Sequence, residues 1–266
     1  MQGGENMIVF LTSSPGGACF EDGKEVLCEL DSRNQFTREL KKVWKENTKC
    51  LMISSSPDDA QMNDHIKGLF SQALPMSGFS LSEIEIWDRR NMEEMKEKML
   101  AYDVIILCGG HLPTQNAFFQ EIELADSIHD FEGVVIGISA GTMNSAQLVY
   151  AMPELEGEAL DKKFKRFLLG LGLTDIMVIP HYQYLKDIML DGMNMITDIA
   201  FGDSKGRTFY ALPDGSYLKI ADGKTLLYGE AYVIKDGKLV QINKDDEVLD
   251  VSDAQDMEKL ILLKRL

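Results

Sequence analysis

A serine in a glycine-rich turn is the residue best placed for chemistry in this chain. The segment Val134-Val-Ile-Gly-Ile-Ser139-Ala-Gly-Thr-Met143 starts as an apolar run and continues as a helix-compatible stretch. Gly-x-Ser-x-Gly between a strand and a helix is typical of a nucleophile elbow, a tight turn that projects the serine hydroxyl from the sheet. The N-terminus of the following helix supplies N–H groups suited to an oxyanion. We therefore predict that Ser139 is a nucleophile.

A pair of glycines ends the preceding apolar run, in Leu107-Cys-Gly-Gly-His111. Gly109 and Gly110 allow backbone N–H groups to come close to a ligand. Because an oxyanion hole needs two donors, we predict that it is formed by the N–H groups of Ala140 and Gly110. His111, which follows the glycine pair, either lines the substrate pocket or caps a loop.

A histidine ends the next apolar run, in Val178-Ile-Pro-His181-Tyr-Gln183. Functional residues of a doubly wound sheet collect at the carboxyl ends of its strands, so His181 is expected on the same edge as Ser139. A serine nucleophile needs a base within hydrogen-bond reach. We predict that His181 is this general base.

Short apolar runs alternate with amphipathic segments along the first two thirds of the chain, which predicts an α/β fold with a doubly wound, mostly parallel sheet. The expected strands are Ile8–Thr12, Cys50–Ser54, Ile84–Trp87, Val104–Leu107, Val134–Ile138 and Ile176–Ile179. The expected helices are Gln35–Glu46, Asp59–Leu74, Asn91–Tyr102, Thr114–His129, Thr142–Tyr150 and Asp187–Phe201.

The last part of the chain has a different pattern. Residues 208–250 contain short β-type runs separated by Asp-Gly turns, which predict an antiparallel β extension of the sheet. An amphipathic helix is expected at Ser252–Leu266. Neither a linker nor a repeat divides the sequence, so residues 1–266 are predicted to form a single domain.

The composition excludes several classes of function. The net charge of −16 disfavours binding to nucleic acid or to anionic membranes. The sequence has no run long enough to span a membrane and no signal-peptide pattern, so a cytoplasmic protein is expected. The four cysteines and four histidines lack metal-ligand spacing, so we expect neither a metal nor another cofactor, and two cysteines, Cys50 and Cys108, are expected to be buried.

Taken together, the motifs resemble the peptidase E and cyanophycinase family of serine peptidases. The matching segments are Gly109-Gly110, Gly137-Ile-Ser-Ala-Gly141, Gly170-Leu-Gly-Leu173 leading into Pro180-His181-Tyr182, and Ala211-Leu-Pro-Asp-Gly215. The resemblance implies a flavodoxin-like fold similar to that of class I glutamine amidotransferases. It also implies a Ser–His–acid triad that cleaves small peptides, with Ser139 as nucleophile and His181 as base.

The same resemblance implies where the acid of the triad lies. In the aspartyl dipeptidase branch of the family, the acid is on the loop that follows the nucleophile helix. Glu154 stands at that offset here, within Met152-Pro-Glu-Leu-Glu-Gly-Glu158. An insertion or deletion would move the role to Glu156 or Glu158.

Two departures from the family pattern bear on specificity. The aspartyl-specific branch holds the substrate carboxylate with a basic residue after the catalytic histidine, but Lys186 is the only basic residue between His181 and Lys205. This argues against aspartyl specificity. His111 stands where the family often has asparagine.

Three other classes of function fit the sequence less well. Class I amidotransferases use a cysteine nucleophile and a His-x-Glu pair, whereas this chain has Ser139 and Gln183. In α/β-hydrolase esterases, the interval between nucleophile and histidine is far longer than that between Ser139 and His181. A relative that binds a peptide without cleaving it would have no need for intact Ser139, His181 and Gly109-Gly110. The side-chain preference and the oligomeric state, a homodimer included, are left open.

Overall fold

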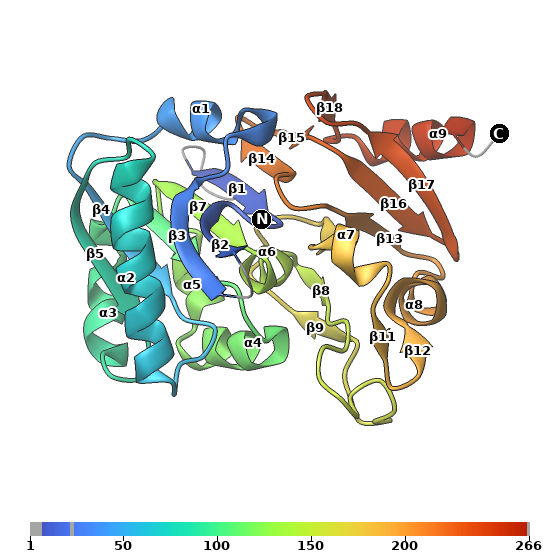
Figure 1. The fold of residues 1–266 in the computed structure, drawn as a ribbon, viewed down its shortest axis with the longest axis horizontal. Coiled ribbons are helices and arrows are strands. Elements are labelled where there is room, and N and C mark those ends of the chain that lie inside the picture. Colours follow the sequence, from blue (N-terminus) through green and yellow to red (C-terminus); the bar gives the residue numbers. More distant parts are fainter. Residues whose placement is uncertain (1–6, 22–23, 265–266) are drawn as a thin grey trace.

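Five parallel strands form one side of the largest sheet. A computed structural model describes residues 7–21 and 24–264. In spatial order the parallel strands are β5 (Leu81–Trp87), β4 (Thr48–Ile53), β6 (Val104–Leu107), β7 (Val134–Ile138) and β1 (Ile8–Thr12). Antiparallel strands continue the sheet beyond β1, namely β14 (Tyr217–Ala221), β15 (Lys224–Tyr228) and β18 (Val248–Asp250) (Figure 1). The predicted α/β fold with a mostly parallel sheet is confirmed.

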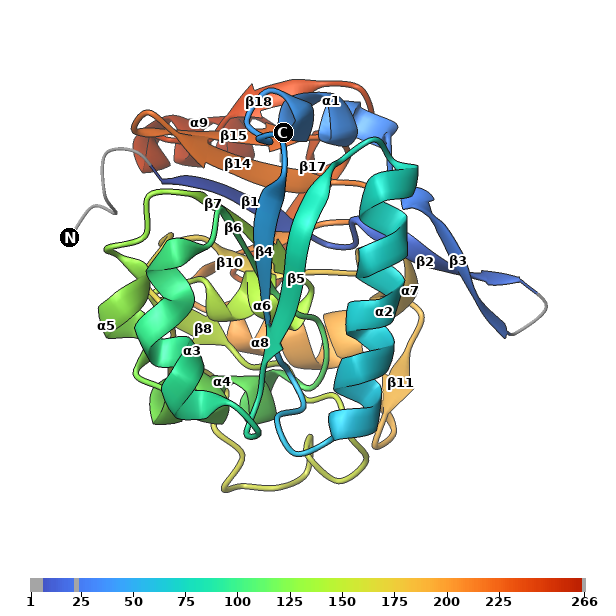
Figure 2. The same cartoon turned by 90° about the vertical axis from the view of Figure 1, so that its left-hand side faces the viewer.

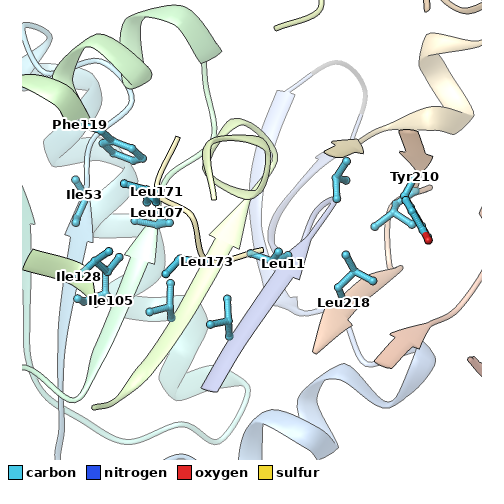
Figure 3. Close-up of a cluster of buried hydrophobic side chains, with 14 of the residues drawn as sticks. Leu11, Ile53, Ile105, Leu107, Phe119, Ile128, Leu171, Leu173, Tyr210 and Leu218 are labelled. Carbon is cyan, nitrogen blue, oxygen red and sulfur yellow. The ribbon is translucent and has the colours of Figure 1, made fainter. Parts of the chain in front are cut away.

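Helices cover both faces of the parallel strands because these strands are apolar on both sides. Cys50 and Met52 pack on the face covered by α1 (Phe36–Lys41) and α2 (Ala60–Met76). The opposite face packs against α3 (Met92–Lys98), α4 (Leu112–Glu121) and α5 (Leu124–Ile128). Figure 3 shows the core on that side, where Ile105 and Leu107 of the sheet lie near Phe119 and Ile128 of the helices.

A second sheet carries β10, the strand that ends next to His181. It contains β10 (Met177–Ile179), β13 (Thr208–Ala211), β16 (Ala231–Lys235) and β17 (Lys238–Asn243), in that order. Figure 1 shows it in the other half of the molecule, with α9 (Ala254–Lys264) beside β17. The antiparallel strands after residue 208 are therefore divided between two sheets, whereas the sequence predicted that they extend one sheet.

Several segments between these elements differ from the prediction. The hairpin of β2 (Gly16–Glu21) and β3 (Lys24–Leu30) was not expected, and it projects from the body in Figure 2. Residues 187–201 were predicted as one helix but form a β11–β12 hairpin (Met189–Leu190 and Met193–Asn194) and a π-helical turn, Met195–Ala200. The remaining elements are α7 (Tyr182–Leu185), α8 (Phe201–Asp203), and 3₁₀ turns at Arg33–Gln35 and Met99–Ala101.

The helix predicted at Thr142–Tyr150 is much shorter in the structure. Helix α6 (Ala140–Asn144) ends early, and β8 (Leu148–Tyr150) then pairs with β9 (Phe167–Leu169). The side chain of Asn144 is buried and bonds to Gln115 Oε1 at 3.1 Å, which anchors the end of the helix. The apolar run that follows gains more from pairing as a strand than from another helical turn.

Cys50, inside β4, and Cys108, directly after β6, are both buried, as predicted. The longest described helix, α2, has 17 residues, and no helix within residues 7–21 and 24–264 is long and apolar enough to cross a membrane.

The contact between α6 and β6 can be tested at Gly141. A Cβ at this position would lie 2.2 Å from the carbonyl oxygen of Leu107, so Gly141→Ala should lower the free energy of unfolding by roughly 1–3 kcal/mol. The control is Gly68→Ala in α2, where nothing lies within 4 Å and the better helix former should add about 1 kcal/mol. Urea unfolding midpoints measure both changes, and equal shifts in the two variants would contradict the close approach of α6 to β6.

Candidate active site

The strand-to-helix turn predicted at Ser139 is present between β7 and α6. Ser139 has φ 49° and ψ −109°, a backbone conformation that residues other than glycine rarely adopt. Such a conformation costs about 1–3 kcal/mol of conformational free energy. Strand β1 holds the turn: the carbonyl oxygen of Thr12 accepts hydrogen bonds from Ser139 N–H at 3.2 Å and from Thr142 Oγ1 at 2.8 Å. The strain is therefore located at the candidate nucleophile and is held there by the sheet.

The glycines of the turn are required by close packing. A Cβ on Gly137 would lie 2.9 Å from Thr142 Cα, and one on Gly141 would overlap the backbone of Leu107. The Gly-x-Ser-x-Gly pattern thus lets α6 leave β7 in a sharp turn. As a result, Ser139 is placed at the carboxyl end of the strand.

The base predicted for Ser139 is within hydrogen-bond distance. His181 Nε2 lies 2.9 Å from Ser139 Oγ. His181 follows β10, which belongs to the second sheet and comes after β8 and β9, so the expectation that it ends the next strand of the same sheet was wrong. His181 also has a positive φ of 54°, which turns the chain from β10 into α7.

The other ring nitrogen of His181 is paired with an aspartate. Nδ1 lies 2.7 Å from Asp214 Oδ1. Asp214 follows β13, which runs parallel to β10, so both residues leave the same edge of the second sheet. A carboxylate at Nδ1 keeps the ring proton there, which leaves Nε2 free to accept the proton of Ser139.

Glu154 is not the partner of His181, contrary to the expectation from the family pattern. The hydrogen bond at Nδ1 is made by Asp214, while Glu154 lies on the solvent-exposed loop after β8. The other candidate acids are also elsewhere: Glu158 bonds to His111, and Glu156 is exposed and makes no hydrogen bond or ion pair within the described part of the chain. Asp214, which follows a strand of the second sheet, therefore occupies the position at His181 Nδ1 that was expected for Glu154.

The sequence contained a signal for Asp214 that the turn pattern concealed. Pro213-Asp214-Gly215 was interpreted as a hairpin turn. It is a turn, since Ser216 N–H bonds to Pro213 O at 3.1 Å, but it connects β13 of the second sheet to β14 of the large sheet rather than two paired strands. Asp214 is preceded by an apolar residue and a proline, as His181 is. The two segments, Leu212-Pro213-Asp214 and Ile179-Pro180-His181, follow neighbouring parallel strands. Two strands that end alike can bring their polar residues together.

Ser13 joins the histidine to the aspartate and was not identified from the sequence. Its hydroxyl donates to Asp214 Oδ1 at 2.7 Å and accepts the backbone N–H of His181 at 2.7 Å. Ser13 is fully buried at the end of β1. Gln183, which in the sequence only argued against an amidotransferase, accepts the backbone N–H of Asp214 at 3.0 Å.

These hydrogen bonds keep Asp214 ionised. Burial alone would raise the pKa of its carboxyl, but the hydrogen bond and charge of His181 outweigh it, with further hydrogen bonds from Ser13 and Gln183. The net result is a pKa below the usual value for aspartate. Asp214 is therefore negatively charged in the neutral pH range, beside the ring of His181.

The glycine pair lies against the serine, as expected for the predicted oxyanion hole. A Cβ built on Gly109 would be 3.3 Å from Ser139 Cβ, and Gly110 has a φ of +151° that places it against Ser55. Within residues 7–21 and 24–264, no hydrogen bond occupies the N–H of Gly110 or of Ala140. Both donors are therefore available to a ligand beside Ser139.

His111 connects the glycine loop to the acidic loop. Its Nδ1 lies 2.7 Å from Thr114 Oγ1 and its Nε2 lies 3.1 Å from Glu158 Oε1. His111 was expected either to line the substrate pocket or to cap a loop. Its hydrogen bonds show a contact between loops. Among the described residues, no group of three side chains is arranged to bind a metal ion.

The chain matches known peptidases in sequence and in fold. The model of peptidase family S51 matches residues 32–228, well over half of the chain. A crystal structure of a peptidase from an acI-B1 Actinobacterium has a TM-score of 0.62 at 17% identity and covers 94% of this chain and 98% of its own. A putative peptidase E protein from Listeria monocytogenes EGD-e has a TM-score of 0.51 at 15% identity, with coverages of 88% and 97%. No curated protein matches the sequence.

The fold is that of an α/β protein with a mostly parallel central sheet, like those two solved structures. The chain belongs to peptidase family S51, the family of peptidase E, and is accordingly a peptidase.

The pairing of His181 predicts which carboxylate matters for turnover. Asp214→Asn should lower kcat by about 100- to 10,000-fold, because a neutral amide neither balances the imidazolium charge nor fixes the ring proton at Nδ1. Glu154→Gln should retain kcat within about tenfold. Steady-state kinetics on one peptide substrate measures both, and the reverse order of effects would restore Glu154 as the acid.

The hydrogen bonds of Ser13 predict a second effect on turnover. Ser13→Ala should lower kcat by about tenfold and leave KM nearly unchanged, since it leaves the N–H of His181 unsatisfied and removes a donor from Asp214.

A matched control for Ser13 is Ser204, which is also fully buried. The Ser204 hydroxyl donates to Phe201 O at 2.9 Å and accepts Gly237 N–H at 2.9 Å, so Ser204→Ala loses the same kinds of bond outside the site. Similar losses of kcat in the two variants would show that the effect of Ser13 is one of stability alone.

Proposed function

We propose that this protein is a serine peptidase that hydrolyses small peptides through an acyl-enzyme on Ser139. The observation that carries the proposal is a single imidazole, that of His181, which lies 2.9 Å from Ser139 Oγ and 2.7 Å from Asp214 Oδ1. This arrangement lets the ring take a proton on one side while a carboxylate balances the charge on the other. We assign His181 as general base and Asp214 as the acid of the triad.

The reaction would proceed in two halves. In the first, Ser139 Oγ forms a bond to the carbonyl carbon while its proton moves to His181 Nε2. The C–N bond then breaks, and His181 gives that proton to the leaving amine. In the second half, a water molecule loses a proton to His181 Nε2 and its oxygen forms a bond to the acyl carbon. The bond between that carbon and Ser139 Oγ then breaks, His181 returns the proton to Oγ, and the carboxylic acid is released.

The charge that develops on the carbonyl oxygen needs donors fixed in advance. The N–H groups of Gly110 and Ala140 are unoccupied among the described residues and lie on the two loops that meet at Ser139. Two such donors stabilise the oxyanion more than they stabilise the neutral carbonyl, which lowers the barrier to the first step. We therefore keep Gly110 and Ala140 as the oxyanion hole, and we assign Gly109 to the close approach of the two loops.

Hydrolysis is favoured over binding without cleavage. A protein that only binds peptides would gain nothing from a buried aspartate held ionised behind a histidine, or from a serine in a strained turn. The resemblance to the aspartyl dipeptidase branch supports small peptides, dipeptides included, as the substrates.

The acyl-enzyme can be tested with Ser139→Ala. The variant should fold normally and lose at least about a thousandfold in kcat on a dipeptide library, because the residual activity of such sites comes from binding and the oxyanion hole. A fluorophosphonate should label Ser139 in the wild type and fail to label the variant, as read by intact mass. Unchanged turnover in Ser139→Ala would overturn the proposal.

A further inference from the structure

Ser55 contacts the glycine loop from just beyond the carboxyl end of β4. Its hydroxyl donates a hydrogen bond to the carbonyl oxygen of Gly109 at 2.5 Å. A Cβ on Gly110 would lie 2.3 Å from Ser55 Oγ. In contrast, a Cβ on Gly109 would lie 3.3 Å from Ser139 Cβ. The two glycines therefore lie between the candidate nucleophile and a second serine, Ser55, which is buried.

The bond to Gly109 O controls the direction of a backbone donor. Gly109 O and the N–H of Gly110 belong to one peptide unit, and no peptide bond in the described part of the chain is cis. In a planar trans peptide, the C=O and N–H groups point in opposite directions. Because the carbonyl is bonded to Ser55, the N–H of Gly110 points away from Ser55, and it has no hydrogen-bond partner among the described residues.

The peptide unit between Gly109 and Gly110 needs such a support. Neither residue has a Cβ, so this unit can rotate about its flanking bonds more freely than a unit between other residues. A half-turn would exchange the two groups and bring the carbonyl oxygen to the side where the N–H now points. A carbonyl oxygen in that place would repel the oxyanion that an N–H stabilises.

A comparable bond holds the other proposed oxyanion donor. The N–H of Ala140 shares a peptide unit with the carbonyl of Ser139, and this oxygen accepts Met143 N–H at 3.0 Å in the first turn of α6. For Ala140, the helix itself therefore fixes the peptide unit. Gly110 lies before the start of α4 and outside any helix, so its peptide unit depends on a side chain, that of Ser55.

The residues on both sides of Ser55 are anchored by a buried network. Ser54 Oγ donates to Asn63 Oδ1 at 2.7 Å and accepts Ser56 N–H at 2.9 Å. Asn63 Nδ2 donates to Ser56 O and to Asp88 Oδ2, both at 3.0 Å. Asn63 and Asp88 are themselves buried. The hydroxyl of Ser55 is thus presented from a segment whose backbone is held in place.

We propose that Ser55 is a positioning residue of the active site, whose hydroxyl holds the Gly109-Gly110 peptide in the orientation that aims the Gly110 N–H at the oxyanion. This inference rests on the proposed function. Ser55 acts through the glycine loop and does not touch the substrate. The aimed N–H stabilises the charged oxyanion more than the neutral carbonyl of the bound substrate, so Ser55 serves the transition state more than binding.

Removal of the hydroxyl should therefore lower kcat and leave KM nearly unchanged. Ser55→Ala should lower kcat by about 10- to 100-fold on the best dipeptide of a library, because the donor remains but its peptide unit is free to turn. Steady-state kinetics measures how the loss divides between kcat and KM. A loss in KM alone, or no loss, would overturn the inference.

The affinity for a tetrahedral adduct gives a second readout. An aldehyde that carries the acyl part of the same substrate forms a reversible bond from its carbonyl carbon to Ser139 Oγ. The serine proton moves to His181, and the carbonyl oxygen becomes the oxyanion. The inhibition constant of the aldehyde should rise in Ser55→Ala by about the factor by which kcat falls. The matching alcohol forms no adduct, so its inhibition constant should stay the same. Equal weakening of both inhibitors would contradict a role at the oxyanion.

Two further variants separate the hydroxyl from the packing of the side chain. Ser55→Thr keeps the donor, whereas Ser55→Val has the same branched shape without it, so any strain from the extra carbon is common to both. The kcat of Ser55→Thr should exceed that of Ser55→Val by about tenfold. Equal kcat values in these two variants would overturn the inference even if Ser55→Ala did not fold.

A matched control lies at the other end of the same strand. Thr48 is fully buried at the start of β4, and its hydroxyl donates to Lys45 O at 2.8 Å. Thr48→Val removes that bond with little change of shape, so it should lower the urea midpoint but leave kcat and both inhibition constants unchanged. A loss of kcat as large as that of Ser55→Ala would mean that stability alone is responsible, against the positioning role.

The outcomes separate this inference from the proposed function. Full turnover in Ser139→Ala would overturn the serine peptidase, whatever Ser55→Ala did. Unchanged kcat in Ser55→Ala, together with lost turnover in Ser139→Ala, would overturn only the positioning role of Ser55.

Discussion

The site depends on one imidazole held between two sheets. Ser139 ends a strand of the large parallel sheet, whereas His181 and Asp214 end β10 and β13 of the second sheet. The two hydrogen bonds of His181, at 2.9 and 2.7 Å, exist only where these strand ends meet. The relative placement of the sheets is therefore constrained to within the tolerance of a hydrogen bond. A shift of 1 Å between them would separate the serine from its base.

That constraint is met through backbone as well as side chains. Ser139 and His181 both have positive φ values, an unfavourable conformation that persists only where neighbouring groups hold it. Strand β1 does so for both residues: Thr12 O accepts the N–H of Ser139, and the hydroxyl of Ser13 accepts the N–H of His181. Two consecutive residues, Thr12 and Ser13, thus hold the proposed nucleophile of one sheet and the proposed base of the other. The strain is located where the chemistry is proposed.

Sequence patterns predicted the parallel strands well, because burial on both faces requires continuous apolar runs. Ile8–Thr12, Val104–Leu107 and Val134–Ile138 have the predicted bounds. The patterns failed where long-range contacts decide the structure. Thr142–Tyr150 does not continue as a helix because β9 pairs with its second half, and Pro213-Asp-Gly is both a turn and the position of the carboxylate at His181. Ser139 and His181 could be identified from the sequence because each follows a clear apolar run. The role of Ser13 is visible only in its hydrogen bonds to Asp214 and to the N–H of His181.

The two carboxylates near His181 differ in what surrounds them rather than in chemical type. Asp214 is buried, yet hydrogen bonds and the charge of His181 compensate for the lost water and hold its pKa low. Burial of the Glu154 carboxyl by the surrounding protein raises its pKa to about 7, because the charges of His111 and His181 and the Leu112 N–H compensate for it only in part. A group meant to balance a transient imidazolium must stay ionised throughout, which requires donors supplied by the protein.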